Sequence, residues 1–186
     1  VQLGVEVRTG CEATRILTEH DRVTGVETSD GTISTGAVVL ATGVRAPALL
    51  AGLGLDYGLT PNRSAVAIFR WPLDYRGPQP VVIDAINDAW MRPESEVTTL
   101  IGAESGSATT SLDDYDETIS PAGVNNARAT LANRFPAFAN ALMRGGWAGM
   151  YMMSPDHHPI IDQIPSVGGL YCMIGDSGSS FKTGPA

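Results

Sequence analysis

The chain has 186 residues, with 12 Lys and Arg against 20 Asp and Glu, which gives a formal net charge of −8. Apolar residues make up 43% of it and charged residues 17%, which is too apolar for a disordered chain and too evenly mixed for a membrane protein. No window reaches the roughly 18 uninterrupted apolar residues that a membrane-spanning helix needs. The acidic balance argues against nucleic acid as a partner, because a phosphate backbone favours clustered Lys and Arg.

The N-terminal part of the chain predicts short strands separated by tight turns. Residues 4–8 alternate apolar and polar side chains, which is the period of a half-buried strand. Residues 13–19 and 23–28 are two further runs, and the polar turn at 20–22 joins them into a hairpin. Residues 37–41 are apolar on both faces, which is typical of a strand in the middle of a sheet, usually a parallel one.

A second group of strands is predicted between residues 65 and 102, where prolines punctuate the apolar runs. These strands are expected at residues 65–70, 81–85, 89–92 and 97–102. A short helix at 47–53 separates the two groups, and two more strands are expected at 147–153 and 170–174. The pattern contains no internal repeat.

One longer helix is predicted in the C-terminal half. Ser120 suits the N-cap and Pro121 the first helical position. The helix is expected to end near Arg134, because Pro136 cannot continue it. The chain is therefore predicted to be an α/β protein of mixed α+β character, with two sheets.

The Asp- and His-rich segment at residues 154–162 suggests a zinc site at first sight. Its two histidines, His157 and His158, are adjacent, and adjacent side chains on an extended segment point in opposite directions. The segment also lacks the His pair at i and i+4 that a helical zinc site uses. We therefore expect no metal here and interpret the segment as a rigid connection.

Two turns are candidates for ligand binding. The strand at 37–41 ends in Thr42 and Gly43, and such a small turn lets a ligand lie against the backbone. The strand at 170–174 leads into the Gly- and Ser-rich residues 175–180, where backbone N–H groups can approach a ligand. The alternative for the first turn is a core strand followed by an ordinary loop.

Asp176 and Lys182 add charge to the second turn. Asp176 can accept hydrogen bonds from sugar or ribityl hydroxyls. Lys182 stands close to an expected helix start, where dipole compensation does not place a cation. An anionic partner explains that lysine, and a solvated surface lysine is the alternative.

An ordered set of short motifs carries a family resemblance. The motifs are ATG at 41–43, WMRP at 90–93, LIGAE at 100–104, RFP at 134–136, GWAG at 146–149, SPD at 154–156, PII at 159–161, GLY at 169–171, GDSG at 175–178, FK at 181–182 and PA at 185–186. In that order and spacing the chain resembles the D-amino-acid oxidase superfamily of flavoproteins, on the side that includes sarcosine oxidase and glycine oxidase. Each motif is loose, but the ordered set is specific and spans nearly the whole chain.

The resemblance implies a Rossmann-like FAD-binding domain and a substrate domain with a mainly antiparallel sheet. Residues 1–43 would be part of the FAD-binding domain, residues 44–164 mostly the substrate domain, and residues 165–186 the return to the FAD-binding domain. The family's Gly-x-Gly-x-x-Gly fingerprint is missing from this chain. We therefore expect a fragment of a longer flavoprotein that does not bind FAD tightly by itself.

The resemblance also assigns cofactor contacts. Ala13 would lie by the adenine, and Thr42 and Gly43 near the dinucleotide. The residues that would surround the flavin ring and ribityl chain are Gly175, Asp176, Ser177, Gly178, Ser179, Ser180 and Phe181. Gly149 stands where some members carry a flavin-linking cysteine, which implies non-covalent FAD, and Ser179 stands where a histidine is common.

The substrate contacts implied are Lys182 and Tyr151. Lys182 resembles the lysine that binds the substrate carboxylate in sarcosine oxidases, and Tyr151 replaces the arginine that grips the carboxylate in glycine oxidases. One cation would thus replace another as the carboxylate anchor. The implied reaction is the oxidation of an amino acid or a secondary amine carboxylate by hydride transfer to FAD, which gives an imine.

Two alternatives remain open at this stage. The first is a flavin dehydrogenase of the same superfamily that uses an acceptor other than oxygen. The second is a non-catalytic, β-rich module or subunit that a partner chain completes. The expected partner of the enzyme is a small-molecule amino acid or amine, with no membrane span. No signal peptide precedes Val1, so we expect a cytoplasmic location.

Overall fold

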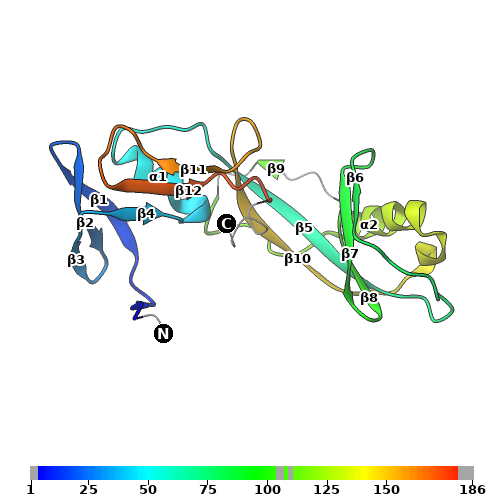
Figure 1. Cartoon of the computed structure of the whole chain (residues 1–186). Helices are drawn as coiled ribbons and strands as arrows, with labels where there is room; N and C mark the ends of the chain where they lie inside the picture. Colours follow the sequence, from blue (N-terminus) through cyan, green and yellow to red (C-terminus); the bar gives the residue numbers. More distant parts are fainter. Residues whose placement is uncertain (1–3, 104–106, 109–110, 180–186) are drawn as a thin grey trace. The chain divides into compact units, whose positions relative to one another are not determined.

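The computed structural model describes residues 4–103, 107–108 and 111–179, and these form two compact units (Figure 1). The terminal unit comprises the described parts of Val1–Thr60 and Met152–Ala186, and the central unit comprises those of Pro61–Tyr151. The sequence had placed the changes of domain after residues 43 and 164. The assignment of FAD to one domain and substrate to the other stays a prediction.

The first sheet of the terminal unit is a three-stranded antiparallel meander. It consists of β1 (Ala13–Glu19), β2 (Arg22–Thr28) and β3 (Gly31–Ser34). The β1–β2 turn places His20 and Asp21 at φ 48° and 57°, a left-handed conformation that suits a tight hairpin. The predicted hairpin is thus confirmed, whereas the strand predicted at residues 4–8 is wrong, because that segment forms no ladder and its valines are exposed.

The second sheet of the terminal unit has the order β11-β12-β4, with β11 at Ile160–Gln163, β12 at Leu170–Ile174 and β4 at Val38–Leu40. The β12–β4 pair is parallel, as the apolar run predicted. The expectation that this run lies in the middle of a sheet is wrong, because β4 is the edge strand among the described residues and Val39 is 69% exposed. Leu40, on the opposite face, belongs to the core of this unit.

A 3-10 turn, η1 (Gly43–Arg45), and the short helix α1 (Ala46–Ala51) follow β4. Leu49 and Leu50 of the helix are buried, and they pack in one hydrophobic cluster with Leu40 and Ile174. The helix begins with a proline near its first position, where the missing N–H costs no hydrogen bond. The cluster holds the turn at Thr42 between β4 and α1.

The central unit is built on a six-stranded sheet of order β10-β5-β8-β7-β6, with β9 paired to β5. The strands are β5 (Thr60–Arg70), β6 (Val82–Asp84), β7 (Ala89–Ser95), β8 (Thr98–Gly102), β9 (Ser107–Ala108) and β10 (Met143–Met153). The pairs β5–β8, β7–β8 and β6–β7 are antiparallel, which confirms the mainly antiparallel sheet. Strands β5 and β10 start earlier in the sequence than predicted.

The predicted long helix is α2 (Pro121–Arg134), beside β6, β7 and β8 in Figure 1. Ser120 is its N-cap, and its Oγ accepts a hydrogen bond of 3.0 Å from the N–H of Gly123. The helix ends at Phe135, and a 3-10 turn, η2 (Pro136–Asn140), follows. Helix and sheet share a core that includes Phe69, Met91, Ile101, Leu131 and Phe138, all fully buried.

An ion pair between a buried carboxylate and an exposed arginine joins strand β6 to the end of helix α2. Asp84 is 2% exposed, and Arg134 donates to its two carboxylate oxygens from Nε at 2.6 Å and from Nη2 at 2.7 Å. Asn87 donates to the same carboxylate from its side chain at 2.8 Å. The hydrogen bonds from Arg134 and Asn87 hold the pKa of Asp84 far below its usual range.

No helix within the described residues is long and apolar enough to cross a membrane.

Candidate functional site

The terminal unit has a cavity of about 350 Å³ beside the turn that follows β4. It is lined by Glu12, Ala13, Thr14, Thr42, Arg45, Ala48 and Leu49. The cavity therefore brings together Ala13 and Thr42, which lie in different elements and were both predicted to contact the dinucleotide. Gly43 follows Thr42 directly in the chain and is not among the residues that line the cavity.

Thr42, which lines this cavity, has a hydroxyl group whose hydrogen bonds are not satisfied. Its Oγ1 is buried and has no hydrogen-bond partner in the part of the chain that the structure describes. A buried hydroxyl without a partner costs about 1–3 kcal/mol, so proteins rarely leave one without a reason. Gly43 has a φ of 52°, and a Cβ added there meets nothing within 4 Å. A polar ligand in the cavity would satisfy this hydroxyl once the Thr42 side chain turns towards it, and Gly43 leaves open space, so these residues fit a nucleotide cofactor.

The second predicted binding element is the loop that follows β12. Gly175 has a φ of 61°, and a Cβ added to it would lie 3.0 Å from both Leu59 Cδ2 and Ser154 Cβ. Ser177 is also left-handed, at a φ of 50°. Only glycine suits position 175, because any side chain would meet both a conformational cost and a close contact.

Asp176 bonds the loop to the chain's own backbone. Its Oδ1 accepts from the N–H of Met152 at 3.3 Å, while the N–H of Ser177 donates to the carbonyl of Met152 at 2.8 Å. The N–H of Ser179 donates to the carbonyl of Asp176 at 2.9 Å, which closes a turn. The structure gives Asp176 a structural role, and the expected bonds to ribityl hydroxyls stay a prediction.

The segment with the adjacent histidines forms a hydrogen-bonded turn. Asp156 Oδ1 accepts from the N–H of His158 at 3.0 Å and from the hydroxyl of Ser154 at 3.1 Å, and these bonds lower the pKa of Asp156. His157 occupies the left-handed region at a φ of 62°. Among the described residues, no cluster of three or more His, Cys, Asp or Glu side chains is placed to hold a metal ion.

Tyr151 lies in the central unit, on β10. Its hydroxyl oxygen accepts a hydrogen bond of 2.8 Å from Asn62 Nδ2, and both side chains are half-buried. No local sequence pattern marks Asn62, because its partner is 89 positions away in the chain. Gly149, also on β10, has open space where a Cβ would stand.

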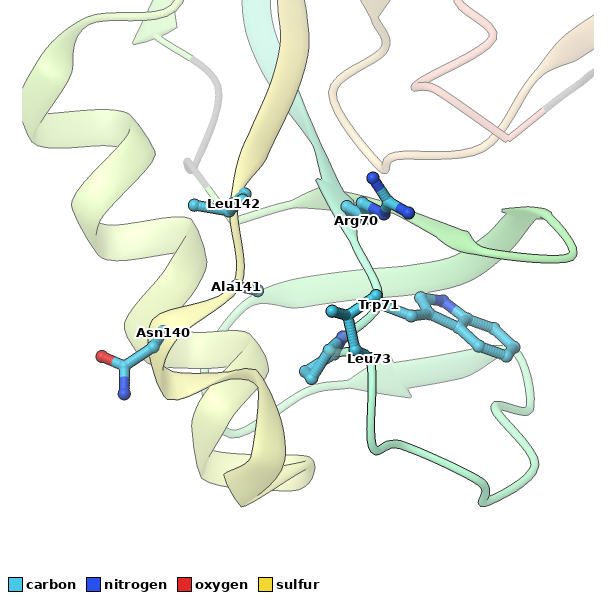
Figure 2. Close-up of a pocket in the computed structure, with 7 residues that line it drawn as sticks. Arg70, Trp71, Leu73, Asn140, Ala141 and Leu142 are labelled. Atoms are coloured by element: carbon cyan, nitrogen blue, oxygen red, sulfur yellow. The ribbon is translucent and has the colours of Figure 1, made fainter.

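A different cavity of the central unit contains none of the predicted site residues. Figure 2 shows it where β5 ends and β10 begins, with Arg70, Trp71 and Leu73 near the segment that holds Asn140, Ala141 and Leu142. Its volume is about 250 Å³, but Leu73 is 81% exposed, so the site is a shallow surface groove. Trp71 is held in place by a hydrogen bond of 2.8 Å from Nε1 to Thr99 Oγ1.

Three of the predicted site residues, Ser180, Phe181 and Lys182, lie outside the described residues. Their roles stay predictions.

Comparison with known proteins gives one consistent family. The family model described as FAD dependent oxidoreductase (DAO) matches residues 1–186. The glycine oxidase of Pseudomonas putida is 28% identical over 182 residues, which cover 98% of this chain and 47% of that protein. The sarcosine oxidase subunit beta of an Arthrobacter species is 27% identical over 186 residues, 99% of this chain and 44% of that protein.

A solved structure with the same fold is the L-proline dehydrogenase from P. horikoshii. It superposes with a TM-score of 0.85 at 26% identity, over 99% of this chain and 49% of that one. The chain thus spans about half the length of the curated relatives that it matches.

Proposed function

The chain belongs to the family of FAD-dependent oxidoreductases, and on this premise we propose that the complete protein oxidises an amino acid or a secondary amine carboxylate, in the manner of sarcosine oxidase. The observation that carries the proposal is the cavity that Ala13 and Thr42 line together, with the Thr42 hydroxyl left without a partner among the described residues. A concave site with a few polar groups that the chain itself leaves unsatisfied suits a polar ligand. The named relatives oxidise or dehydrogenate amino acids and amines, which supports the substrate class.

The chain's own residues would hold FAD without a covalent bond. Thr42 would bond to the dinucleotide, with Gly43 leaving room for it, and Ala13 would pack by the adenine. The loop from Gly175 to Phe181 would face the flavin, where its small residues leave the backbone accessible. When bound, FAD would supply the redox chemistry, which is the removal of a hydride equivalent from the α-carbon of the substrate; the imine so formed would be hydrolysed by water.

Two side chains would orient the substrate. Lys182 would pair with the substrate carboxylate and so fix the C–H bond relative to the cofactor. Tyr151 would form part of the pocket wall, and the hydrogen bond from Asn62 holds its ring in one position. No general base is needed, because the protein's task is to position the substrate.

The electron acceptor divides the proposal into two candidates. Oxidation by molecular oxygen is favoured by the glycine oxidase relative, whereas an acceptor other than oxygen is favoured by the L-proline dehydrogenase structure. Measuring hydrogen peroxide against dye reduction, with the same substrate and the same preparation, separates them.

The test of the function uses the complete protein loaded with FAD and a panel of glycine, sarcosine, proline and D-amino acids. Turnover of at least one of these is expected, and Lys182→Met is expected to raise its KM about 10- to 100-fold, since a charge-assisted hydrogen bond to the carboxylate is lost. An amine substrate without a carboxylate serves as the control, because its KM should not change. An unchanged KM for the carboxylate substrate would refute the anchoring role of Lys182.

A further inference from the structure

Ser154 lies at the end of β10, where three segments of the terminal unit meet. It is only 2% exposed, and both its hydroxyl and its N–H make hydrogen bonds. The hydroxyl donates toward the carbonyl of His158 at 2.6 Å and toward Asp156 Oδ1 at 3.1 Å. Both acceptors belong to the turn that follows it, so the single proton of Ser154 is directed into that turn.

The remaining bonds of Ser154 reach the glycine-rich loop. The N–H of Ser154 donates to Ser177 Oγ at 3.1 Å, and the two hydroxyl oxygens are 3.2 Å apart. Because the proton of Ser154 is directed to His158 and Asp156, its lone pairs are available to the Ser177 hydroxyl, which also donates to the carbonyl of Gly175 at 3.1 Å. The two serines therefore join the loop to the turn across 23 positions of sequence.

Ser177, the loop residue bonded to Ser154, has an unfavourable backbone conformation that its surroundings must stabilise. Ser177 is left-handed, at a φ of 50°, which is unfavourable for a residue with a Cβ. Gly175, two residues earlier, lies close to Ser154, because a Cβ added to it would stand 3.0 Å from Ser154 Cβ. A loop with such a backbone keeps its shape only where its surroundings fix it, and Ser154 supports it with its N–H, its hydroxyl and its Cβ. Substitution of Ser154 keeps the N–H bond and removes the hydroxyl contact alone.

We propose that Ser154 is a positioning residue for the flavin-binding loop, acting through Ser177 rather than through any contact with FAD. The inference rests on the proposed function, which places the flavin against the loop of residues 175–181. It assigns a purpose to the segment of Asp156, His157 and His158: this turn fixes the proton of Ser154, and Ser154 then fixes the loop. A preformed loop binds its ligand without the entropy cost of ordering.

The test compares Ser154→Val with Ser154→Thr in the complete protein, since valine and threonine have the same shape and differ by the hydroxyl. FAD affinity is measured by quenching of flavin fluorescence. Ser154→Val is expected to weaken FAD binding about 10- to 100-fold, and Ser154→Thr to restore most of it. Ser154→Ala also removes the hydroxyl but adds no methyl group. It therefore tests the same loss of FAD affinity if valine or threonine disturbs folding. Ser34→Val, the same change at an exposed position of β3, is the matched control and should not alter binding.

A second readout does not depend on the cofactor. In the protein without FAD, amide hydrogen exchange of residues 175–179 should become faster in Ser154→Val and Ser154→Ala, and stay slow in Ser154→Thr. If wild-type protein binds no FAD, the proposed function fails, while the exchange rates still decide whether Ser154 positions the loop. Wild-type FAD affinity and exchange rates in both Ser154→Val and Ser154→Ala would overturn the proposal.

Discussion

Gly175 offers the sharpest test of the loop geometry, because two independent terms oppose a side chain there. A change of Gly175 to Ala places a Cβ at a φ of 61°, which costs about 1–2 kcal/mol for an L-residue in the left-handed region. The same Cβ lies 3.0 Å from Leu59 Cδ2 and from Ser154 Cβ. Relieving such an overpacked contact costs typically about 1–3 kcal/mol more. The expected loss in free energy of unfolding is therefore about 2–5 kcal/mol.

Gly54 separates the two terms, because it shares the backbone conformation but not the contacts. Its φ is 72°, and a Cβ added there meets nothing within 4 Å. Gly54→Ala should therefore lose only the conformational term, about 1–2 kcal/mol. The difference between the two variants measures the contact with Leu59 and Ser154 alone.

The assay must report on the terminal unit. All three tryptophans lie in the central unit, so intrinsic fluorescence follows that unit, and amide hydrogen exchange of the β12 peptide during urea titration follows the terminal unit. Equal losses in Gly175→Ala and Gly54→Ala would refute the packing argument, because the neighbours would then have moved aside at no cost. No loss in either variant would refute the left-handed backbone itself.

Two further predictions concern buried polar groups. Thr42→Val removes the unsatisfied hydroxyl and keeps the side-chain shape, so it should leave the FAD-free protein as stable or up to about 2 kcal/mol more stable, yet weaken FAD binding. Thermal unfolding with and without FAD measures both effects. A destabilised FAD-free variant would contradict the reasoning. Asp84→Asn should destabilise the central unit near neutral pH. Because the folded-state pKa of Asp84 is depressed, its stabilisation is complete above the unfolded pKa of about 3.9. The gap in urea midpoint between wild type and Asp84→Asn should therefore stay constant from pH 7 to about pH 5 and shrink on further acidification; a gap that is independent of pH would exclude the carboxylate as its source.

Elements that local chemistry determines were predictable from the sequence. Ser120 and Pro121 start α2, since the hydroxyl satisfies a free N–H and the proline needs none, and both effects act within one turn. The hairpin at His20 is of the same kind. Residues 4–8 show the opposite case, because alternation makes a strand possible, but a strand also needs a partner ladder that no local pattern specifies.

Pairings between distant segments were not predictable from the residues alone. Ala13 and Thr42 line one cavity, and only the family resemblance had placed them together. Asn62 was missed because its contact with Tyr151 depends on how β5 and β10 fold, not on spacing. The edge position of Val39 was not predicted for a related reason. An apolar run indicates which faces of a strand can be buried, but not how many strands pair with it.

Two buried hydroxyl groups of the terminal unit differ in whether the chain itself satisfies their hydrogen bonds. This difference separates a hydroxyl that supports the fold from one that is left for a ligand. The Ser154 hydroxyl is surrounded by acceptors of its own chain, so it has little capacity left for a ligand. The Thr42 hydroxyl has none within the described residues, although it is just as inaccessible to water. Folding alone would select against such an orphan, because burial without a partner is a net cost. The two hydroxyl groups therefore predict different outcomes. A hydroxyl-deleting change should weaken FAD binding at both positions but destabilise the FAD-free protein only at Ser154.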